Sequence, residues 1–173
     1  MNEARPSPVA PICLVVGAVL GLGGSFAPSA SLRGLAWGID GIALIVAASL
    51  LATYLLRRGQ DTVAAGFLIF IAGQSLVVSG SALSLEASAP VFGAGAGLWA
   101  AALMVISVPD LMPKVVRVVG CVAALLLAAT AVQIFAGRSL TPLSEPLPFF
   151  AYPLLVFTLL GWAWWCRQPN AAP

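Results

Sequence analysis

A single carboxylate interrupts a long apolar stretch of the sequence and is the strongest candidate for chemistry. Asp40 lies within GLAWGIDGIALIVAASLL, which runs from Gly34 to Leu51 and holds no other charged residue. An aspartate at the centre of a membrane-spanning helix costs about 2.5–3.5 kcal/mol. Intramembrane carboxylates therefore usually face the interior of a helix bundle, where they mark ion, proton or substrate sites.

Further polar residues lie in apolar stretches at a similar depth. At a helical rise of 1.5 Å per residue they fall about 5–14 Å below the membrane surface nearest Arg33. Arg33 precedes Asp40 by seven residues, or two helical turns, so both side chains point to one face. We therefore predict an intramembrane polar site in the outer leaflet, formed by Asp40, Gln74, Ser75, Ser79, Thr130, Gln133, Tyr152 and Arg33.

Two hypotheses account for this polar site. In the first, it binds an ion, a proton or a small substrate from the outer side of the membrane. In the second, Asp40 and Gln74 hydrogen-bond across two helices and fix their register, because unpaired polar groups are costly in hydrocarbon. The sequence favours the second hypothesis, since no other acid, histidine or lysine accompanies Asp40 at comparable depth.

The composition indicates that this site belongs to an integral membrane protein. Of the 173 residues, 61% are hydrophobic and 8% are charged, against about 45–50% and about 25% in soluble domains. Six apolar segments, each long enough to cross the hydrocarbon as a helix, predict an all-α polytopic bundle without a soluble domain. They cover residues 10–27, 32–56, 62–83, 90–108, 115–136 and 148–166 of a single membrane domain, 1–173.

Two alternatives concern these segments. Transmembrane strands alternate apolar and polar residues, whereas these segments are apolar on all sides, so helices fit better. The first segment could instead be a signal peptide, with Ser25 and Ala27 at plausible cleavage positions. Its N-terminal region is poorly basic, however, and Pro28 follows the cleavage site directly. In the last segment, Pro153 predicts a kink.

The basic residues predict the orientation of the six spans. The side that holds both termini carries six of the eight lysines and arginines, and the other side carries Arg33 and Arg138. The positive-inside rule then places the N-terminus and the C-terminus in the cytoplasm. The short loops and tails favour a bacterial inner membrane as the location.

Glycine spacing predicts close helix packing. Three GxxxG pairs occur in the apolar segments, and this spacing lets two helices approach closely. The pairs serve either packing within the bundle, which we favour, or a homodimer interface. They are Gly17 and Gly21, Gly34 and Gly38, and Gly93 and Gly97.

No enzymatic signature is present in the sequence. It contains no histidine and no HExxH, GxSxG or CxxC motif, so we expect neither catalysis nor a metal or cofactor. The net charge of +2 without a basic cluster argues against nucleic acid as a partner. We expect the lipid bilayer and a second copy or another membrane protein as partners. The predicted function is a non-catalytic accessory or packing subunit, and the alternative is a small transporter or channel subunit that acts as a homodimer.

Overall fold

Six α-helices make up the computed structural model, which describes residues 6–168. They are α1 (Val9–Ser25), α2 (Ala30–Leu56), α3 (Asp61–Gly80), α4 (Ala89–Ser107), α5 (Lys114–Phe135) and α6 (Ala151–Trp165). No strand occurs within residues 6–168, so the predicted all-α class is confirmed. Four helices, α2 to α5, are long and apolar enough to cross a membrane, whereas α1 and α6 have 17 and 15 residues.

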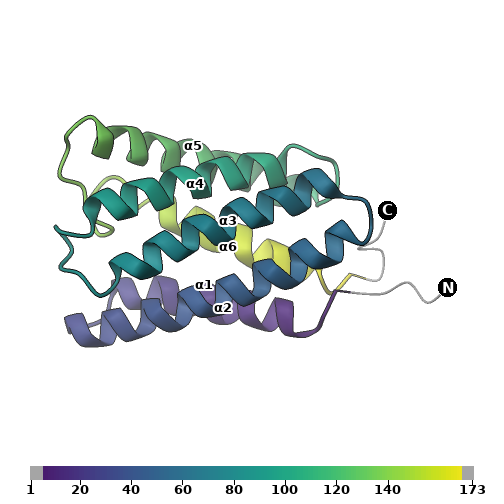
Figure 1. Ribbon diagram of the computed structural model, residues 1–173, viewed down its shortest axis with the longest axis horizontal. Helices are drawn as coiled ribbons and strands as arrows, with labels where there is room; N and C mark the ends of the chain where they lie inside the picture. The colour runs from purple at the N-terminus through teal and green to yellow at the C-terminus, as the bar shows by residue number, and fades with distance from the viewer. Residues whose placement is uncertain (1–5, 169–173) are drawn as a thin grey trace.

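The helices run alternately in opposite directions and form a closed ring (Figure 1). Each helix packs against the helices before and after it in the chain, and α6 closes the ring on α1. The end that holds the start of α1, the end of α6 and the loops 57–60 and 108–113 is the terminal end. The opposite end, with the loops 26–29, 81–88 and 136–150, is the distal end.

Aromatic side chains fill the centre of the ring. Phe67 of α3 packs edge-to-face on Trp162 of α6, with the ring centroids 4.9 Å apart, and Phe70 lies 5.8 Å from the same indole. Trp99 of α4 stacks on Phe70 at 6.2 Å. Pairs of this kind contribute about 0.5–1.5 kcal/mol beyond the area that they bury. They join α3 to α6 across the ring, so this part of the ring has a packed core.

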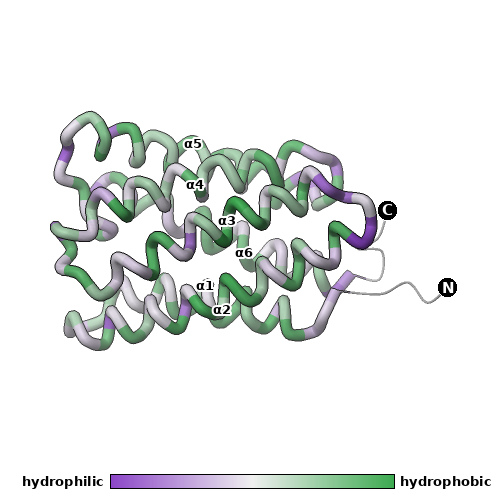
Figure 2. Tube along the Cα trace, viewed as in Figure 1, coloured by the Kyte–Doolittle hydropathy of each residue, from purple (hydrophilic) through white to green (hydrophobic). Residues whose placement is uncertain are grey.

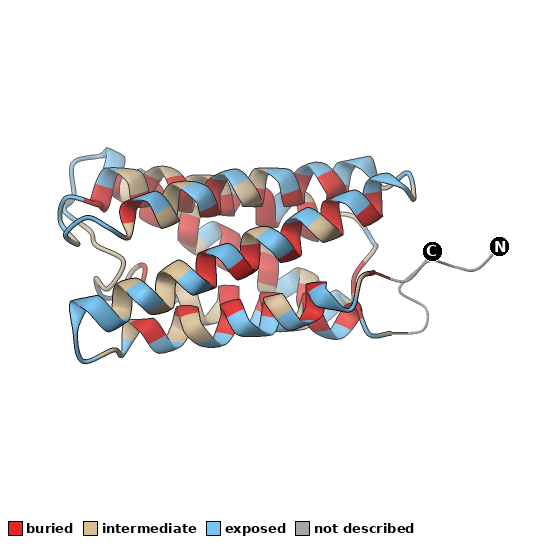
Figure 3. Ribbon diagram, turned by 60° about the horizontal axis from the view of Figure 1, so that its bottom comes forward, coloured by how far each residue is buried: buried red, intermediate tan, exposed pale blue. Residues whose placement is uncertain are grey.

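The outside of the ring is apolar as well, and hydrophilic residues gather toward the two ends of the bundle (Figure 2). Exposed positions run along the outer faces of the helices (Figure 3). Among them, Ile42, Val115 and Leu125 are each more than 60% exposed. Monomeric soluble proteins rarely expose apolar surface of this extent, whereas lipid solvates it without cost. The exposed apolar surface therefore suggests an integral membrane protein, as the four long apolar helices do.

Turn residues define where the helices begin and end. Gly59 after α2 and Gly137 after α5 have φ angles of +71° and +90°, which glycine adopts without a Cβ clash. The Ser29 hydroxyl accepts a hydrogen bond from the Leu32 N–H at 3.3 Å and so caps the N-terminus of α2. This cap fixes the start of the helix that carries Asp40.

The last helix starts later than the sequence predicts. Its segment is predicted from residue 148, but α6 begins at Ala151. The Pro148 carbonyl accepts hydrogen bonds from the N–H groups of Ala151 and Tyr152, at 2.8 and 3.1 Å. Pro153 consequently lies in the first turn of α6, where a backbone N–H has no intrahelical partner to lose. The predicted kink assumed a proline well inside the helix, and Pro153 instead lies near the start of α6.

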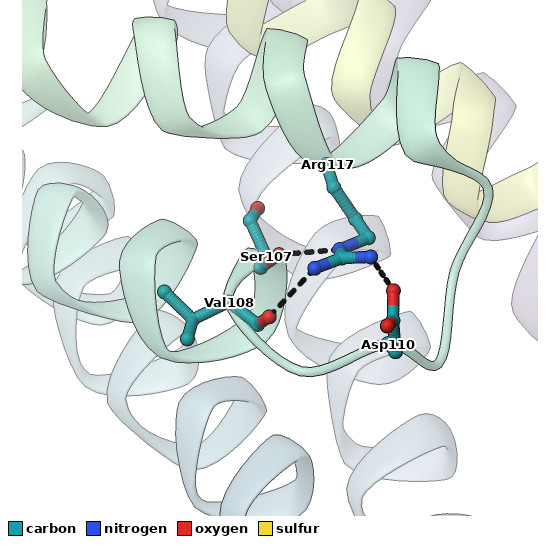
Figure 4. A network of polar contacts seen from close by, with 4 residues as sticks. All are labelled: Ser107, Val108, Asp110 and Arg117. Atoms are coloured by element: carbon teal, nitrogen blue, oxygen red, sulfur yellow. Dashed lines mark hydrogen bonds and ion pairs between the residues drawn. The ribbon is translucent and has the colours of Figure 1, made fainter.

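Arg117 of α5 satisfies the C-terminal end of α4 (Figure 4). Its Nε donates to the Ser107 carbonyl at 2.9 Å, its Nη2 donates to the Val108 carbonyl at 2.8 Å, and its Nη1 pairs with Asp110. The last carbonyl groups of a helix have no intrahelical partner, and a cation there also interacts favourably with the helix dipole. Arg117 thereby fixes the turn between α4 and α5.

The predicted glycine pairs differ in their surroundings. A Cβ added at Gly17, Gly21 or Gly93 would press on a neighbouring side chain, whereas one at Gly34 or Gly97 would make ordinary contacts. A Cβ at Gly38 would meet nothing within 4 Å.

The tightest backbone approach lies elsewhere, between α3 and α4. A Cβ at Gly73 would lie 3.0 Å from the Gly95 carbonyl oxygen.

Gly73→Ala is expected to destabilise the fold by about 1–3 kcal/mol, because the new methyl group meets a backbone oxygen that cannot rotate away. Gly38→Ala is the matched control, since it adds the same group to a helix in open space. It should leave stability unchanged or raise it by up to about 1 kcal/mol. Thermal unfolding in detergent measures both effects, and equal melting temperatures would contradict the close approach of α3 and α4.

Candidate functional site

Asp40 lies inside the ring, in its distal half. It is 4% exposed and ten residues from the start of α2, a distance of about 15 Å along the helix. Its side chain faces α1. The carboxylate oxygens lie 3.2 Å from the Cβ positions that alanines at Gly17 and Gly21 would have. These two glycines, one turn apart, therefore leave the space that the carboxylate occupies.

Two buried polar atoms, one on α2 and one on α3, lack hydrogen-bond partners in the described part of the chain. Among residues 6–168, neither Asp40 Oδ1 nor Gln74 Oε1 has a hydrogen-bond partner, although Gln74 is only 1% exposed. The Gln74 amide nitrogen points toward α2, 3.4 Å from the position of a Cβ at Gly41. The interhelical bond on which the register hypothesis rests is thus absent from the described part of the chain.

Asp40 lines a cavity of about 40 Å³. Because one water molecule needs about 10–15 Å³ on this measure, the cavity has room for about three water-sized groups. Its walls come from five helices, from the loop 81–88 and from the loop between α5 and α6. They comprise Ser25, Trp37, Asp40, Val77, Gly80, Ser81, Ser88, Phe92, Trp99, Pro142 and Tyr152.

A second cavity of about 90 Å³ adjoins the first and shares Trp37, Gly80, Ser81 and Ser88 with it. Arg33 lines this second cavity, two turns nearer the distal end than Asp40. The Arg33 Cζ lies 6.0 Å from the centroid of the Trp37 ring, and the buried Nε has no hydrogen-bond partner in residues 6–168. Arg33 thus turns to Trp37, on the distal side of the carboxylate.

Trp37 and Tyr152 hold α1 against the cavity. The Trp37 Nε1–H donates to the Gly21 carbonyl at 3.1 Å. The Tyr152 hydroxyl and the Asp40 carboxylate would both touch a Cβ at Gly21, so these two groups of α6 and α2 lie near one another. The absence of a side chain at Gly21 therefore brings three helices together at the site.

The structure brings Asp40 and Tyr152 together at the cavity. Gln74 packs against α2 at Gly41 but does not line the cavity. Ser75 and Ser79 are exposed on the outside of the ring. Their hydroxyls donate to backbone carbonyls of the same helix, those of Ile71 and Leu76, at 2.8 and 2.7 Å. The depth of a residue along a helix does not say toward which side its side chain points. The two serines lie at a depth similar to that of Asp40 but on the opposite, outer face of the bundle.

The polar residues of α5 lie away from Asp40. Within the described chain α5 does not contact α2, because the two helices occupy opposite sides of the ring. The Thr130 hydroxyl donates to the Leu126 carbonyl at 2.9 Å, and Gln133 Oε1 accepts from Arg138 at 2.6 Å. Neither residue lines the cavity at Asp40.

Sequence reasoning missed the aromatic walls of the cavity, Trp37, Phe92 and Trp99. One signal was available, because Trp37 precedes Asp40 by three residues and so shares its helix face. Trp99 shows no such link, because it lies on α4, two helices after α2 in the chain. The sequence around it is apolar and equally consistent with an ordinary core tryptophan.

Asp40→Asn is expected to leave the melting temperature unchanged or raised. Within residues 6–168 the carboxylate makes no interhelical bond that an amide would lose, and buried charge is costly. Arg117→Met is the positive control. Removing a charged donor from two helix-end carbonyls should cost about 1–3 kcal/mol. If Asp40→Asn lowers stability as much as Arg117→Met in the same detergent, then the carboxylate holds the helices together and the site has a structural role.

Comparison of the chain with protein-family models, with curated proteins and with solved structures finds no match.

Proposed function

We propose that all six helices span a bacterial inner membrane, with both termini in the cytoplasm. The distribution of charge supports this orientation. Of the seven described basic residues, Arg57, Arg58, Lys114, Arg117 and Arg167 belong to the terminal end, and Arg33 and Arg138 to the distal end. Helices α1 and α6 extend for only about 26 and 23 Å. Local thinning of the bilayer accommodates spans that are slightly short of the hydrocarbon thickness.

A fluorescent protein fused after Pro173 is expected to be bright in the cytoplasm of a bacterial host, because six spans return the chain to the side on which it starts. Alkaline phosphatase fused at the same position should be inactive, since that enzyme folds only where disulfides form. The reverse pattern, a dark fluorescent fusion and an active phosphatase, would overturn the six-span orientation.

We propose further that the protein is a small, non-catalytic transporter or channel subunit whose distal cavity binds a small cation at Asp40. The observation that carries this proposal is the buried Asp40 side chain, which lines a cavity and whose Oδ1 has no hydrogen-bond partner in residues 6–168. A buried carboxylate without a protein partner is expensive unless a bound cation or proton compensates it. A purely structural aspartate would be expected to bond to a neighbouring helix instead.

A second candidate function is the accessory or packing subunit. It is favoured by the aromatic core at Phe67, Phe70 and Trp162, which occupies the centre of the ring on the terminal side of the cavity. With this core in place, a cation bound in the distal cavity could cross to the terminal end only after a rearrangement or with the help of a second copy. The transporter proposal therefore includes a homodimer. In the accessory-subunit alternative, no cation is transported.

Asp40→Asn is expected to reduce cation uptake by proteoliposomes to the level of protein-free liposomes, because the amide removes the charge that holds the ion. Uptake would be driven by an inside-negative potential and followed for protons and for labelled sodium, rubidium and methylammonium. The matched control is Asp61→Asn, the same chemical change at the exposed first residue of α3. It should retain wild-type uptake.

Two results would count against cation transport through this site. Uptake of a tested cation that persists in Asp40→Asn would remove Asp40 from the pathway. If proteoliposomes with the wild-type protein take up none of the tested cations, and the protein binds none in detergent, the accessory subunit becomes the better explanation.

A further inference from the structure

The walls of the Asp40 cavity are rich in aromatic residues. Trp37 comes from α2, Phe92 and Trp99 come from α4, and Tyr152 comes from α6. The face of an aromatic ring carries negative potential and attracts a cation whose centre lies within about 6 Å of the ring centroid. The Arg33 guanidinium, 6.0 Å from the centroid of Trp37, is an example within this chain. The cavity thus combines one carboxylate with several rings that favour a cation.

The same walls are poorly suited to a metal ion. Calcium takes six to eight oxygen ligands and magnesium requires a near-ideal octahedron, while potassium filters use rings of backbone carbonyls. Asp40 is the only carboxylate in the described wall of the cavity. Within residues 6–168, no group of three or more histidine, cysteine or acidic side chains is placed to hold a metal ion.

The polar atoms at the cavity favour a ligand that donates hydrogen bonds. The Asp40 carboxylate is an acceptor in the wall, and its Oδ1 has no hydrogen-bond partner in residues 6–168. The Nε1–H of Trp99, another wall residue, is a donor without a partner in the same residues. The hydroxyls of Ser81 and Ser88 already donate to backbone carbonyls at 2.7 and 2.8 Å, so they offer only lone pairs. A cation that carries N–H groups would satisfy these acceptors, whereas a quaternary ammonium would not.

The size of the cavity further limits the cations that can bind. The cavity holds about three water-sized groups. Ammonium has one heavy atom and methylammonium has two, so both fit beside the carboxylate. Tetramethylammonium has five heavy atoms and exceeds the space. A small methyl group would also gain from the apolar part of the wall at Val77 and Phe92.

We propose that the Asp40 cavity selects ammonium or a small primary alkylammonium ion over metal cations, with the carboxylate accepting its N–H groups and the aromatic walls stabilising its charge. This inference deepens the proposed function and rests on it, because it names the class of cation that the site takes. The aromatic residues then act as specificity determinants, and Asp40 is the anchor that any cation would need.

The test is binding of labelled methylammonium to the purified protein in detergent, with unlabelled competitors at constant ionic strength. Ammonium should displace the label at concentrations similar to those of methylammonium itself. Tetramethylammonium, sodium, potassium and magnesium should be at least about tenfold weaker, because they exceed the space or lack N–H donors. Asp40→Asn should abolish the binding.

Phe92→Leu isolates the contribution of an aromatic wall. It removes a ring face while keeping an apolar side chain, and should weaken methylammonium binding about threefold to tenfold. Phe67→Leu is the matched control, since Phe67 is a buried ring of the aromatic core that does not line the cavity. It should leave the affinity unchanged in protein that remains folded, as judged by circular dichroism.

The outcomes separate this inference from the function on which it rests. If a metal cation binds as tightly as methylammonium in an Asp40-dependent manner, the amine selectivity is overturned and the cation site stands. Equal effects of Phe92→Leu and Phe67→Leu would remove the aromatic walls from recognition. If no cation binds the wild-type protein, both the inference and the proposed cation site fail.

Discussion

The Asp40 carboxylate can be buried in this bundle only because α1 presents two glycines to it. Gly17 and Gly21 lie one helical turn apart and leave space for both carboxylate oxygens, each 3.2 Å from a position that a Cβ would take. The same gap admits the Tyr152 hydroxyl and exposes the Gly21 carbonyl to the Trp37 indole. A larger residue at either position would press on the side chains of Asp40, Leu44 or Tyr152. The site therefore depends on a packing contact between helices whose own sequences are almost entirely apolar.

Ring closure makes that contact possible. Because α6 packs on both α5 and α1, the start of α6 reaches the distal half of the ring beside α2. The aromatic core around Trp162 ties α6 to α3 and occupies the centre of the ring on the terminal side. The result is a bundle with two distinct halves. The terminal half has an aromatic core. The distal half contains a small polar cavity that a second cavity at Arg33 adjoins.

Much of this architecture is readable from the sequence, and the limits have a physical cause. Apolar length and breakers identify all six helices, with most ends within three residues of those observed. The cost of a buried charge identifies Asp40, and depth along the helices brings in Tyr152. Depth does not reveal how each helix is rotated about its axis. The sequence therefore places Ser75 and Ser79 with Asp40, whereas in the structure they lie on the outside of the ring and bond to their own helix. Nor does depth reveal which helices are neighbours in the ring. The aromatic walls that α4 contributes, Phe92 and Trp99, therefore emerge only from the three-dimensional arrangement.

The central claim is that the Asp40 carboxylate faces a ligand-accessible cavity instead of bonding to another helix. A high-resolution structure of the protein in lipid nanodiscs, determined in ammonium chloride, tests this claim most directly. The account predicts a non-protein density peak about 2.7–3.2 Å from Asp40 Oδ1, between the carboxylate and the aromatic walls. A direct hydrogen bond from Gln74 or another protein group to Oδ1, with side chains filling the cavity, would contradict it.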